Sequence, residues 1–538
     1  MSADTPNSRT KAPTTPATAS PGLLRKTSIV SFMTLLSRIL GLVRDVVFAR
    51  MFGASLVMDA FLVANRIPNM LRRFFAEGAF SQGFVPVMAR YREQHSESDA
   101  REFAGAVAGT LGLVLFLVTL VGVVAAPVLV AIVAPGFIDD DGRFDLATLM
   151  LRFTFPYLLF VSLTAFAGGI LNTWGRFAVP AFTPVLLNLT LIGFAVWLAP
   201  LLDEPGMALA YAVFVAGVIQ LAFQLPFLAR LRMLSWPRWR PAHEGVKRVV
   251  KLMLPAIFGS SVAQLNVLVG GILASLLGVG KISLLYYADR LMEFPLGLFG
   301  IALATVTLPY LSRQHATRSH AAFAATLDWS MRLVLLISLP AAIGLVILAE
   351  PLVATIFFGG EFTGNDVVLA ALALKAFALG LIGFSYVKIL APAFFARENT
   401  VTPVRIGLVA LGVNFLLSVV LAWYLTRIGS EGAHAGLALA TSVAALLNAA
   451  LLYRGLRRDA VMQHGPGWTP FLLRIAIASA VMWGILSVLD KPLDWWLASS
   501  LTGRVTELAI NVAAGACAYF LALVLVGMRP SQLGMKPH

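Results

Sequence analysis

The sequence predicts an all-α polytopic membrane protein with fourteen transmembrane helices, arranged as two six-helix lobes and an appended helix pair. Three observations predict this fold: an apolar composition, loop charges that alternate in sign, and an internal repeat. Of the 538 residues, 59% are hydrophobic and 13% are charged, against roughly 25% charged in an ordinary soluble domain. The mean hydropathy of +0.83 excludes soluble, disordered and fibrous proteins, because so few polar residues cannot cover a water-facing surface.

Fourteen apolar segments follow a polar N-terminal tail. Residues 1–26 are rich in Pro, Thr, Ser and Ala, which predicts a disordered cytoplasmic tail rather than a cleaved signal peptide. The segments after it reach the roughly 20 residues that a bilayer requires. We expect spans at 28–49, 57–89, 102–135, 146–173, 180–201, 206–232, 246–277, 283–312, 329–349, 365–392, 401–426, 432–456, 469–488 and 505–528. They divide into an N-lobe (27–233), a C-lobe (244–458) and a pair (468–528).

The loops between these segments alternate between basic and acidic. One set carries cations such as Arg92, Arg238 and Arg457, and the alternate set carries acids such as Asp140 and Glu431. Because Lys and Arg accumulate in cytoplasmic loops, we expect the basic set and both chain termini in the cytoplasm. Membrane topology thus accounts for the net charge of +14, and we expect no nucleic-acid partner.

The sequence contains no pattern of a catalytic or cofactor site. Its single cysteine, Cys517, lies in an apolar run, which excludes a disulfide framework and a paired-cysteine metal site. Neither an HExxH sequence nor a phosphate-binding glycine loop is present. We therefore expect no enzyme activity, no metal and no cofactor.

Two distant parts of the chain repeat at a constant spacing. ARMFGASLVMDAFLVANRI (49–67) resembles ASLLGVGKISLLYYADRL (274–291), and APVLVAI (126–132) resembles EPLVATI (350–356). The matched positions are separated by 224 or 225 residues. Six spans in each half give both halves the same orientation, so we expect a pseudo-twofold axis along the membrane normal.

Charged residues inside the predicted spans point to a cavity. Each intramembrane cation costs about 2.5–3.5 kcal/mol on insertion scales and marks a functional site by default. Arginine favours bidentate contacts with phosphate oxygens, so a basic, water-filled cavity for an anionic substrate is expected around Arg38, Arg44, Arg72 and Arg290. Nearby acids either gate this cavity or neutralise the arginines: Asp45, Asp59, Glu77, Asp289 and Glu293. The expected bending points are Pro68, Gly78 and Pro295.

Three stretches closely resemble the MurJ (MviN) lipid II flippases of the multidrug/oligosaccharidyl-lipid/polysaccharide exporter superfamily. They are SRILGLVRD (37–45), FGASLVMDAFLVANRIPNMLRRFFAEGAFSQGFVP (52–86) and YYADRLMEFPLGLFGIAL (286–303). The resemblance extends over about residues 27–528, and its most specific part is RRFFAEGAFSQGFVP (72–86).

The resemblance implies a carrier of undecaprenyl-pyrophosphate-linked disaccharide-pentapeptide, which crosses the bacterial inner membrane from the cytoplasmic to the periplasmic leaflet. It places six residues in the substrate cavity: Ser37, Arg38, Arg44, Asp59, Arg72 and Arg290. Arg44, Arg72 and Arg290 would clamp the pyrophosphate, Arg38 and Asp59 would shape the cavity and its gating, and the last two spans would hold the lipid tail. We expect a monomer, with other cell-wall synthesis proteins as candidate partners.

Other functions stay open at this point. A flippase for another polyprenyl-pyrophosphate-linked oligosaccharide would need the same arginines, whereas a multidrug antiporter would favour carboxylates and aromatics. An enzyme acting on polyprenyl phosphate would need acidic metal ligands or a catalytic base, for which Asp139–Asp141 is the candidate loop.

Some members of the family bind sodium through carboxylates, but residues 252–277 contain no Asp or Glu. This absence argues against sodium coupling. The membrane potential is the expected drive, worth about 2.3 kcal/mol per charge for each 100 mV.

Overall fold

The computed structural model describes residues 21–75, 78–297, 319–459 and 467–528, together with residues 311, 314, 461 and 462. The regular elements in these ranges are helices. Ten helical segments among them are long and apolar enough to cross a membrane. The predicted all-α, multi-pass membrane fold is therefore confirmed, while the count of fourteen spans stays a prediction.

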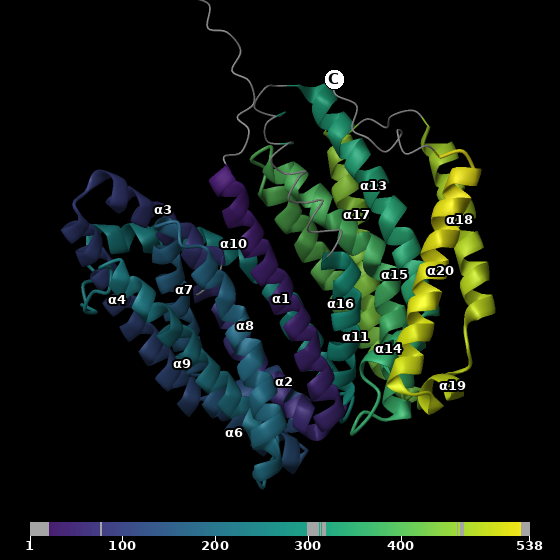
Figure 1. Cartoon of the computed structure of the whole chain (residues 1–538), viewed down its shortest axis with the longest axis horizontal. Coiled ribbons are helices and arrows are strands. Elements are labelled where there is room, and N and C mark those ends of the chain that lie inside the picture. Colours follow the sequence, from purple (N-terminus) through teal and green to yellow (C-terminus); the bar gives the residue numbers. More distant parts are fainter. Residues whose placement is uncertain are drawn as a thin grey trace, which may run out of the picture.

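The first half of the chain forms one bundle (Figure 1). Its helices are α1 (Pro21–Phe52), α2 (Leu56–Phe75), α3 (Gly78–Gln94), α4 (Glu97–Val124), α5 (Ala126–Val133), α6 (Asp141–Thr154), α7 (Tyr157–Thr173), α8 (Ala178–Gly193) and α9 (Met207–Arg230). Three short helices connect them: η1 (Pro135–Phe137), η2 (Phe194–Leu198) and η3 (Ala199–Leu201). Within the bundle α1 packs on α8, α2 on α6, and α7 on α9.

The second half forms another bundle, with a helix pair at its edge. Its helices are α10 (Glu244–Ser275), α11 (Lys281–Pro295), α13 (His320–Ile347), α14 (Ala349–Ile356), α15 (Gly364–Phe395), α16 (Val401–Arg427) and α17 (Ala433–Arg458). The edge contains α18 (Trp468–Leu489), α19 (Leu493–Ala498) and α20 (Leu501–Leu525), drawn in yellow in Figure 1. Helix α15 packs between α13 and α17, and α18 packs on α13. Helix α10 packs on α3 of the first bundle and α16 of the second.

Matching helix lengths support the internal repeat. Helices α1 and α10, which open the two halves, each have 32 residues. Helices α4 and α13 each have 28 residues, and each is followed by a helix of 8 residues, α5 or α14. At these positions the two halves therefore repeat the same helix lengths.

The two bundles meet at one end of the molecule through a matched pair of glycine contacts. The amide of Glu361 donates to the carbonyl oxygen of Arg50 at 2.9 Å, and a Cβ at Gly360 would overlap that carbonyl. On the other side the amide of Gly136 donates to Ser275 Oγ at 3.2 Å, and a Cβ at Gly136 would overlap the Ser275 carbonyl. We call this the closed end. In Figure 1 the bundles converge there and spread apart toward the start of α1.

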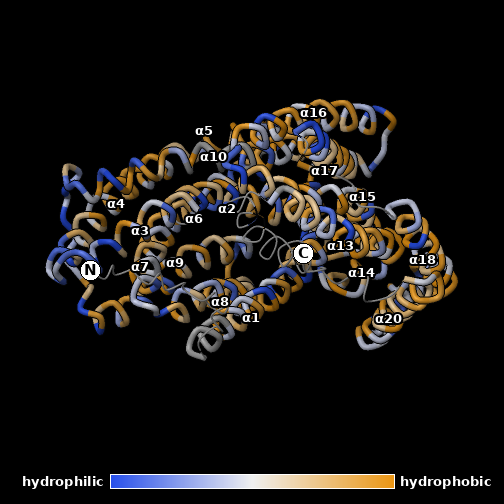
Figure 2. The backbone as a smooth tube through the Cα atoms, turned by 90° about the horizontal axis from the view of Figure 1, so that it is seen from above, coloured by the Kyte–Doolittle hydropathy of each residue, from blue (hydrophilic) through white to orange (hydrophobic). Residues whose placement is uncertain are grey.

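A shared apolar core holds the closed end together. One cluster of buried side chains includes Phe48 of α1, Phe61 of α2, Tyr287 of α11 and Phe357 after α14. It therefore joins helices of both bundles. Figure 2 shows that hydrophobic residues run along most helices in both halves, as lipid-facing and core-facing surfaces both require.

The helix is interrupted within two of the predicted spans, 102–135 and 146–173, although the second still forms one membrane-crossing segment over Gly142–Thr173. The physical reason is a residue that interrupts the backbone ladder: proline lacks an amide and crowds the preceding turn, while glycine adopts conformations closed to other residues. In span 57–89, residues 76 and 77 lie outside the described part of the chain, and Gly78, which opens α3, has a φ of +32°. Span 102–135 divides at Ala125, just before Pro127, and span 146–173 divides at Pro156.

The helix α1 begins at Pro21, inside the segment 1–26 that was expected to be a disordered tail. Proline is favoured in the first turn of a helix, because its missing amide would have no helical partner there. Residues 1–20 lie outside the described part of the chain. Of the expected bending points, Pro68 lies inside α2 and Pro295 is the last residue of α11.

Candidate functional site

The junction of the bundles brings together three of the predicted charged residues. One carboxylate oxygen of Asp45, on α1, accepts hydrogen bonds from Arg44 Nε at 2.9 Å and from Arg44 Nη2 at 2.6 Å. Its other oxygen lies 3.3 Å from Nε of Arg290, which belongs to α11 in the other bundle. Asp45 is 2% exposed. One buried carboxylate therefore holds two arginines, one from each bundle.

Two uncharged side chains, which the sequence analysis missed, complete this cluster. The hydroxyl of Tyr286 donates to Asp45 at 2.7 Å and accepts from Arg44 Nη2 at 3.1 Å. The Asn188 carbonyl on α8 accepts from Arg44 Nη1 at 3.0 Å, and its amide donates to the Ser37 carbonyl oxygen at 3.0 Å. Ser37 thus contributes its backbone to the cluster.

A signal for Tyr286 was available in the sequence. It precedes Arg290 by four residues, so the two lie on the same face of a helix, and the Arg290 guanidinium lies 5.0 Å from the centre of the Tyr286 ring. The sequence contained no comparable signal for Asn188. A single polar residue in an apolar helix can hydrogen-bond to the backbone of its own helix or to any neighbouring helix, so its partner cannot be predicted.

A second charged group lies toward the open end of α11. Arg290 Nη1 lies 3.2 Å from Glu293 Oε2, and Asp289 interacts with both of these charges. Lys388 of α15 is attracted by Glu293 and repelled by Arg38. The expected cavity residues from α1 and α11 therefore share one charged region, which Lys388 extends to α15.

Asp59 has a different environment from the one expected of a cavity residue. Its carboxylate is completely buried. It accepts the Ser283 hydroxyl at 2.6 Å, the Ser283 amide at 2.9 Å and the Gly280 amide at 2.7 Å. These donors form the first turn of α11, so Asp59 of one bundle caps a helix of the other.

The remaining predicted residues lie apart from the Arg44 cluster. Arg72 is in the last turn of α2, sixteen residues and roughly 24 Å along the helix axis from its start at the closed end. Arg44 lies about 12 Å from the closed end of α1 by the same measure, so Arg72 is nearer the open end.

Glu77 lies outside the described residues, and Gly78 opens α3. In the described ranges no three His, Cys, Asp or Glu side chains gather to hold a metal ion.

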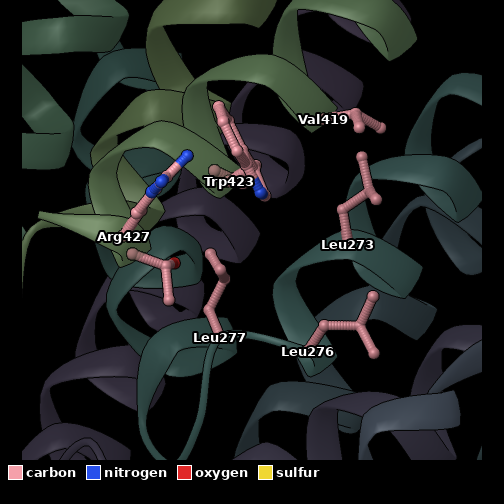
Figure 3. A pocket seen from close by; sticks show the side chains of 8 residues that line it. Leu273, Leu276, Leu277, Val419, Trp423 and Arg427 are labelled. Carbon is pink, nitrogen blue, oxygen red and sulfur yellow. The ribbon is translucent and has the colours of Figure 1, made fainter. Parts of the chain in front are cut away.

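A separate cavity of about 430 Å³ lies between α10 and α16. Figure 3 shows its apolar lining and the neighbouring side chains of Trp423 and Arg427, whose guanidinium lies 5.2 Å from the Trp423 ring centre. The cavity contains none of the predicted site residues. Its lining consists of Leu273, Leu276, Leu277, Val419, Ala422, Trp423, Thr426 and Arg427.

Comparison with known proteins identifies close relatives over nearly the whole chain. A probable lipid II flippase MurJ from Vibrio cholerae is 45% identical over 523 residues, covering 96% of this chain and 98% of the relative. The lipid II flippase MurJ from Burkholderia cenocepacia is 42% identical over 512 residues, covering 94% and 98%.

Solved structures agree in fold. A structure described as lipid II flippase MurJ in an inward closed conformation has a TM-score of 0.75 at 24% identity, covering 93% of this chain and 98% of that one. An inward-facing multidrug resistance MATE family transporter has a TM-score of 0.63 at 15% identity, covering 81% and 98%. The family model described as lipid II flippase MurJ matches residues 48–529. The chain therefore belongs to the MurJ family of lipid II flippases.

Proposed function

We propose that this chain moves lipid II, the undecaprenyl-pyrophosphate-linked peptidoglycan precursor, from the cytoplasmic to the periplasmic leaflet by alternating access. The observation that carries the proposal is the contact of Asp45 with arginines from both bundles. A carboxylate from the protein occupies the place where a pyrophosphate would find two guanidinium groups. Family membership supplies the identity of the substrate.

Substrate binding would exchange one anion for another. A pyrophosphate has more acceptor oxygens and more negative charge than one carboxylate, and charge-assisted contacts to arginine are the strong ones. It would displace Asp45 as the partner of Arg44 and Arg290. Because α1 and α11 belong to different bundles, the new contacts couple binding to the relative position of the bundles.

The closed end is assigned to the periplasmic side in this proposal. The α9–α10 loop contains Arg238 and Arg240 and connects helices at the opposite end, where α1 begins. By the positive-inside rule that end and both termini are cytoplasmic. Movement to the outward-facing state then has to break the Asp59 contacts with α11 and the glycine contacts at Gly136 and Gly360.

We further propose that the membrane potential drives transport, without a metal ion or other cofactor. The segment 252–277 of α10 contains no carboxylate that could hold sodium. The charged side chains around Asp45 give the field charges to act on, at about 2.3 kcal/mol per charge for each 100 mV. The proposed unit is a monomer, and other cell-wall synthesis proteins are candidate partners.

The site argues against one of two other functions. A multidrug antiporter for organic cations is disfavoured, because Asp45 is already paired with Arg44 and Arg290. A flippase for another polyprenyl-pyrophosphate-linked oligosaccharide would use the same arginine pair, since the diphosphate is common to both substrates. Only a direct test of the sugar and peptide can distinguish the two flippases.

The test uses cells depleted of their own flippase. The chain is expressed beside Arg44→Ala and Arg290→Ala, and lipid II exposed on the periplasmic side is measured with an externally added cleaving agent. We expect the wild type to restore the exposure of lipid II on the periplasmic side, and both variants to fail at equal expression. A wild-type chain that is folded in the membrane and fails to expose lipid II would exclude this substrate.

A further inference from the structure

The loop between α9 and α10 presents two tryptophans on the outside of the protein. Trp236 is 85% exposed, and Trp239 and Leu234 are each 54% exposed. Three cations of the same loop are exposed as well: Arg232, Arg238 and Arg240. Because α9 ends the first bundle and α10 begins the second, this loop is the connection between the bundles. The connection therefore exposes aromatic and cationic side chains together.

Helix α4 holds the backbone of this loop in place. The amide of Arg238 donates to the Gly105 carbonyl oxygen at 2.9 Å. A Cβ at Gly109 would overlap the backbone of Arg238, and a Cβ at Gly105 would lie 3.0 Å from the Trp236 carbonyl oxygen. Two glycines one turn apart thus let the loop lie directly against α4, which fixes the position of the loop along that helix.

The position along α4 sets the depth of the loop in the membrane. Glu102 is the last charged residue of α4 and forms an ion pair with Arg240. The apolar run 103–124 follows and has about the length that a bilayer requires. Gly105 and Gly109 lie roughly 3 Å and 9 Å beyond the start of this run along the helix axis. The loop therefore lies beside the first turns of the membrane-crossing segment.

We propose that residues 234–239 lie in the lipid interface at the open end of the molecule, with Trp236 and Trp239 inserted at the boundary of headgroups and acyl chains, and that α4 holds them at this depth. Tryptophan favours this boundary because its ring is apolar and its N–H requires a polar partner. Interfacial segments reach about 5–10 Å into it, which agrees with the contacts on α4. Lipid phosphates supply the anion for the exposed Arg238. The membrane thereby holds the connection between the bundles.

The experiment measures depth with nitroxide labels on the full-length chain in lipid nanodiscs, with Cys517→Ser as the background. One label is attached at Leu234→Cys, which keeps both tryptophans, and another at Trp236→Cys. Two positions on α4 calibrate the scale: Ser98→Cys in the exposed first turn and Phe116→Cys, 53% exposed on the membrane-crossing part. The readout is accessibility to oxygen, which enters lipid, against accessibility to a water-soluble nickel chelate.

We expect the labels at 234 and 236 to be reached by oxygen in preference to nickel, at depths between those of the two labels on α4. Gly109→Val in the Leu234→Cys chain should displace the loop and raise its nickel accessibility. Gly112→Val is the matched control, since nothing lies within 4 Å of a Cβ there, and it should change nothing.

Two results would overturn the inference. If either loop label is as accessible to nickel as the label at Ser98→Cys, the loop faces water, where its tryptophans are free to bind a soluble protein. If Gly109→Val leaves the depth of the label at Leu234→Cys unchanged, α4 does not hold the loop in the interface. Neither result depends on the substrate that the chain moves, so the proposed function is tested separately.

Discussion

Asp59 and Ser283 join the two halves of the molecule by a double contact. The Asp59 carboxylate on α2 accepts both the hydroxyl and the amide of Ser283, at 2.6 Å and 2.9 Å, in the first turn of α11. A helix N-terminus attracts negative charge and needs acceptors for its free amides. Here the acceptor comes from the opposite bundle, so the cap exists only while the closed end is closed.

Asp59→Ala should open the closed end. The change leaves the α11 donors unpaired, at a cost of about 1–3 kcal/mol to the closed state, and Ser283→Ala should have a smaller effect in the same direction. The measurement is labelling of Ser55→Cys by a periplasmic thiol reagent, in a chain where the exposed native Cys517 is replaced by Ser. Asp203→Ala, at an exposed loop carboxylate, is the control. Unchanged labelling of the Asp59→Ala variant would refute the idea that the Asp59–Ser283 contact keeps this end closed.

Asp45→Asn should make the chain less stable and more responsive to diphosphate. The substitution keeps the shape of the side chain but leaves Arg44 without its carboxylate and Arg290 with Glu293 alone, and an uncompensated buried charge is costly. Inorganic pyrophosphate should then raise the melting temperature of the variant more than that of the wild type, because a ligand stabilises the state it binds.

A second variant tests the cause of that response. Asp45→Asn combined with Arg290→Gln removes one of the two cations that Asp45 contacts. The double variant should melt at a higher temperature than Asp45→Asn, though below the wild type, and its melting temperature should no longer rise with pyrophosphate. An equal pyrophosphate response in the wild type and in Asp45→Asn would contradict the idea that Asp45 occupies the anion site.

Gly136→Ala and Gly360→Ala should each destabilise the closed end. The added methyl group overlaps the Ser275 or the Arg50 carbonyl, and such overpacking typically costs about 1–3 kcal/mol. Gly360 also has a φ of +59°, so its replacement should cost more. Gly412→Ala on α16 is the matched control, since nothing lies within 4 Å of its added methyl. Equal melting temperatures in all three variants would exclude the proposed contacts.

Asp140 should contribute a pH-dependent part of the stability. It lies in the loop before α6, where Arg143 Nε donates to its Oδ2 at 2.7 Å and holds the pKa of Asp140 below its ordinary value. A lowered folded-state pKa adds stability above the unfolded pKa of about 4. This part is lost as the pH falls through the folded-state pKa.

The corresponding measurement is the melting temperature between pH 7 and pH 3. Asp140→Asn should be less stable than the wild type at pH 7, and the two curves should approach each other toward pH 3. The control is Asp139→Asn, at the neighbouring acid. Curves that stay parallel over the whole range would show that the Asp140–Arg143 contact does not stabilise the fold.

The sequence predicted the site as a set of charged residues, without their partners. Arg44, Asp45 and Arg290 were recognisable because charge inside an apolar segment is costly and therefore conspicuous. Tyr286 and Asn188 were missed, since a single polar side chain in a membrane helix has many alternative partners. Asp59 was recognised, but its contact with α11 depends on a helix whose N-cap residue, Gly280, lies 221 residues later in the chain.

The sequence by itself determined the membrane class, the helical segments and the repeat of two halves, because hydrophobic length and spacing are local properties of the chain. It also marked Arg44 and Arg290, which contact Asp45. Only the tertiary structure decided that Asp45 joins Arg44 to Arg290, that Asp59 caps α11, and which end of the molecule is closed. These depend on how α1 and α2 meet α11 across the bundle junction, and neither hydropathy nor spacing along one helix encodes that crossing.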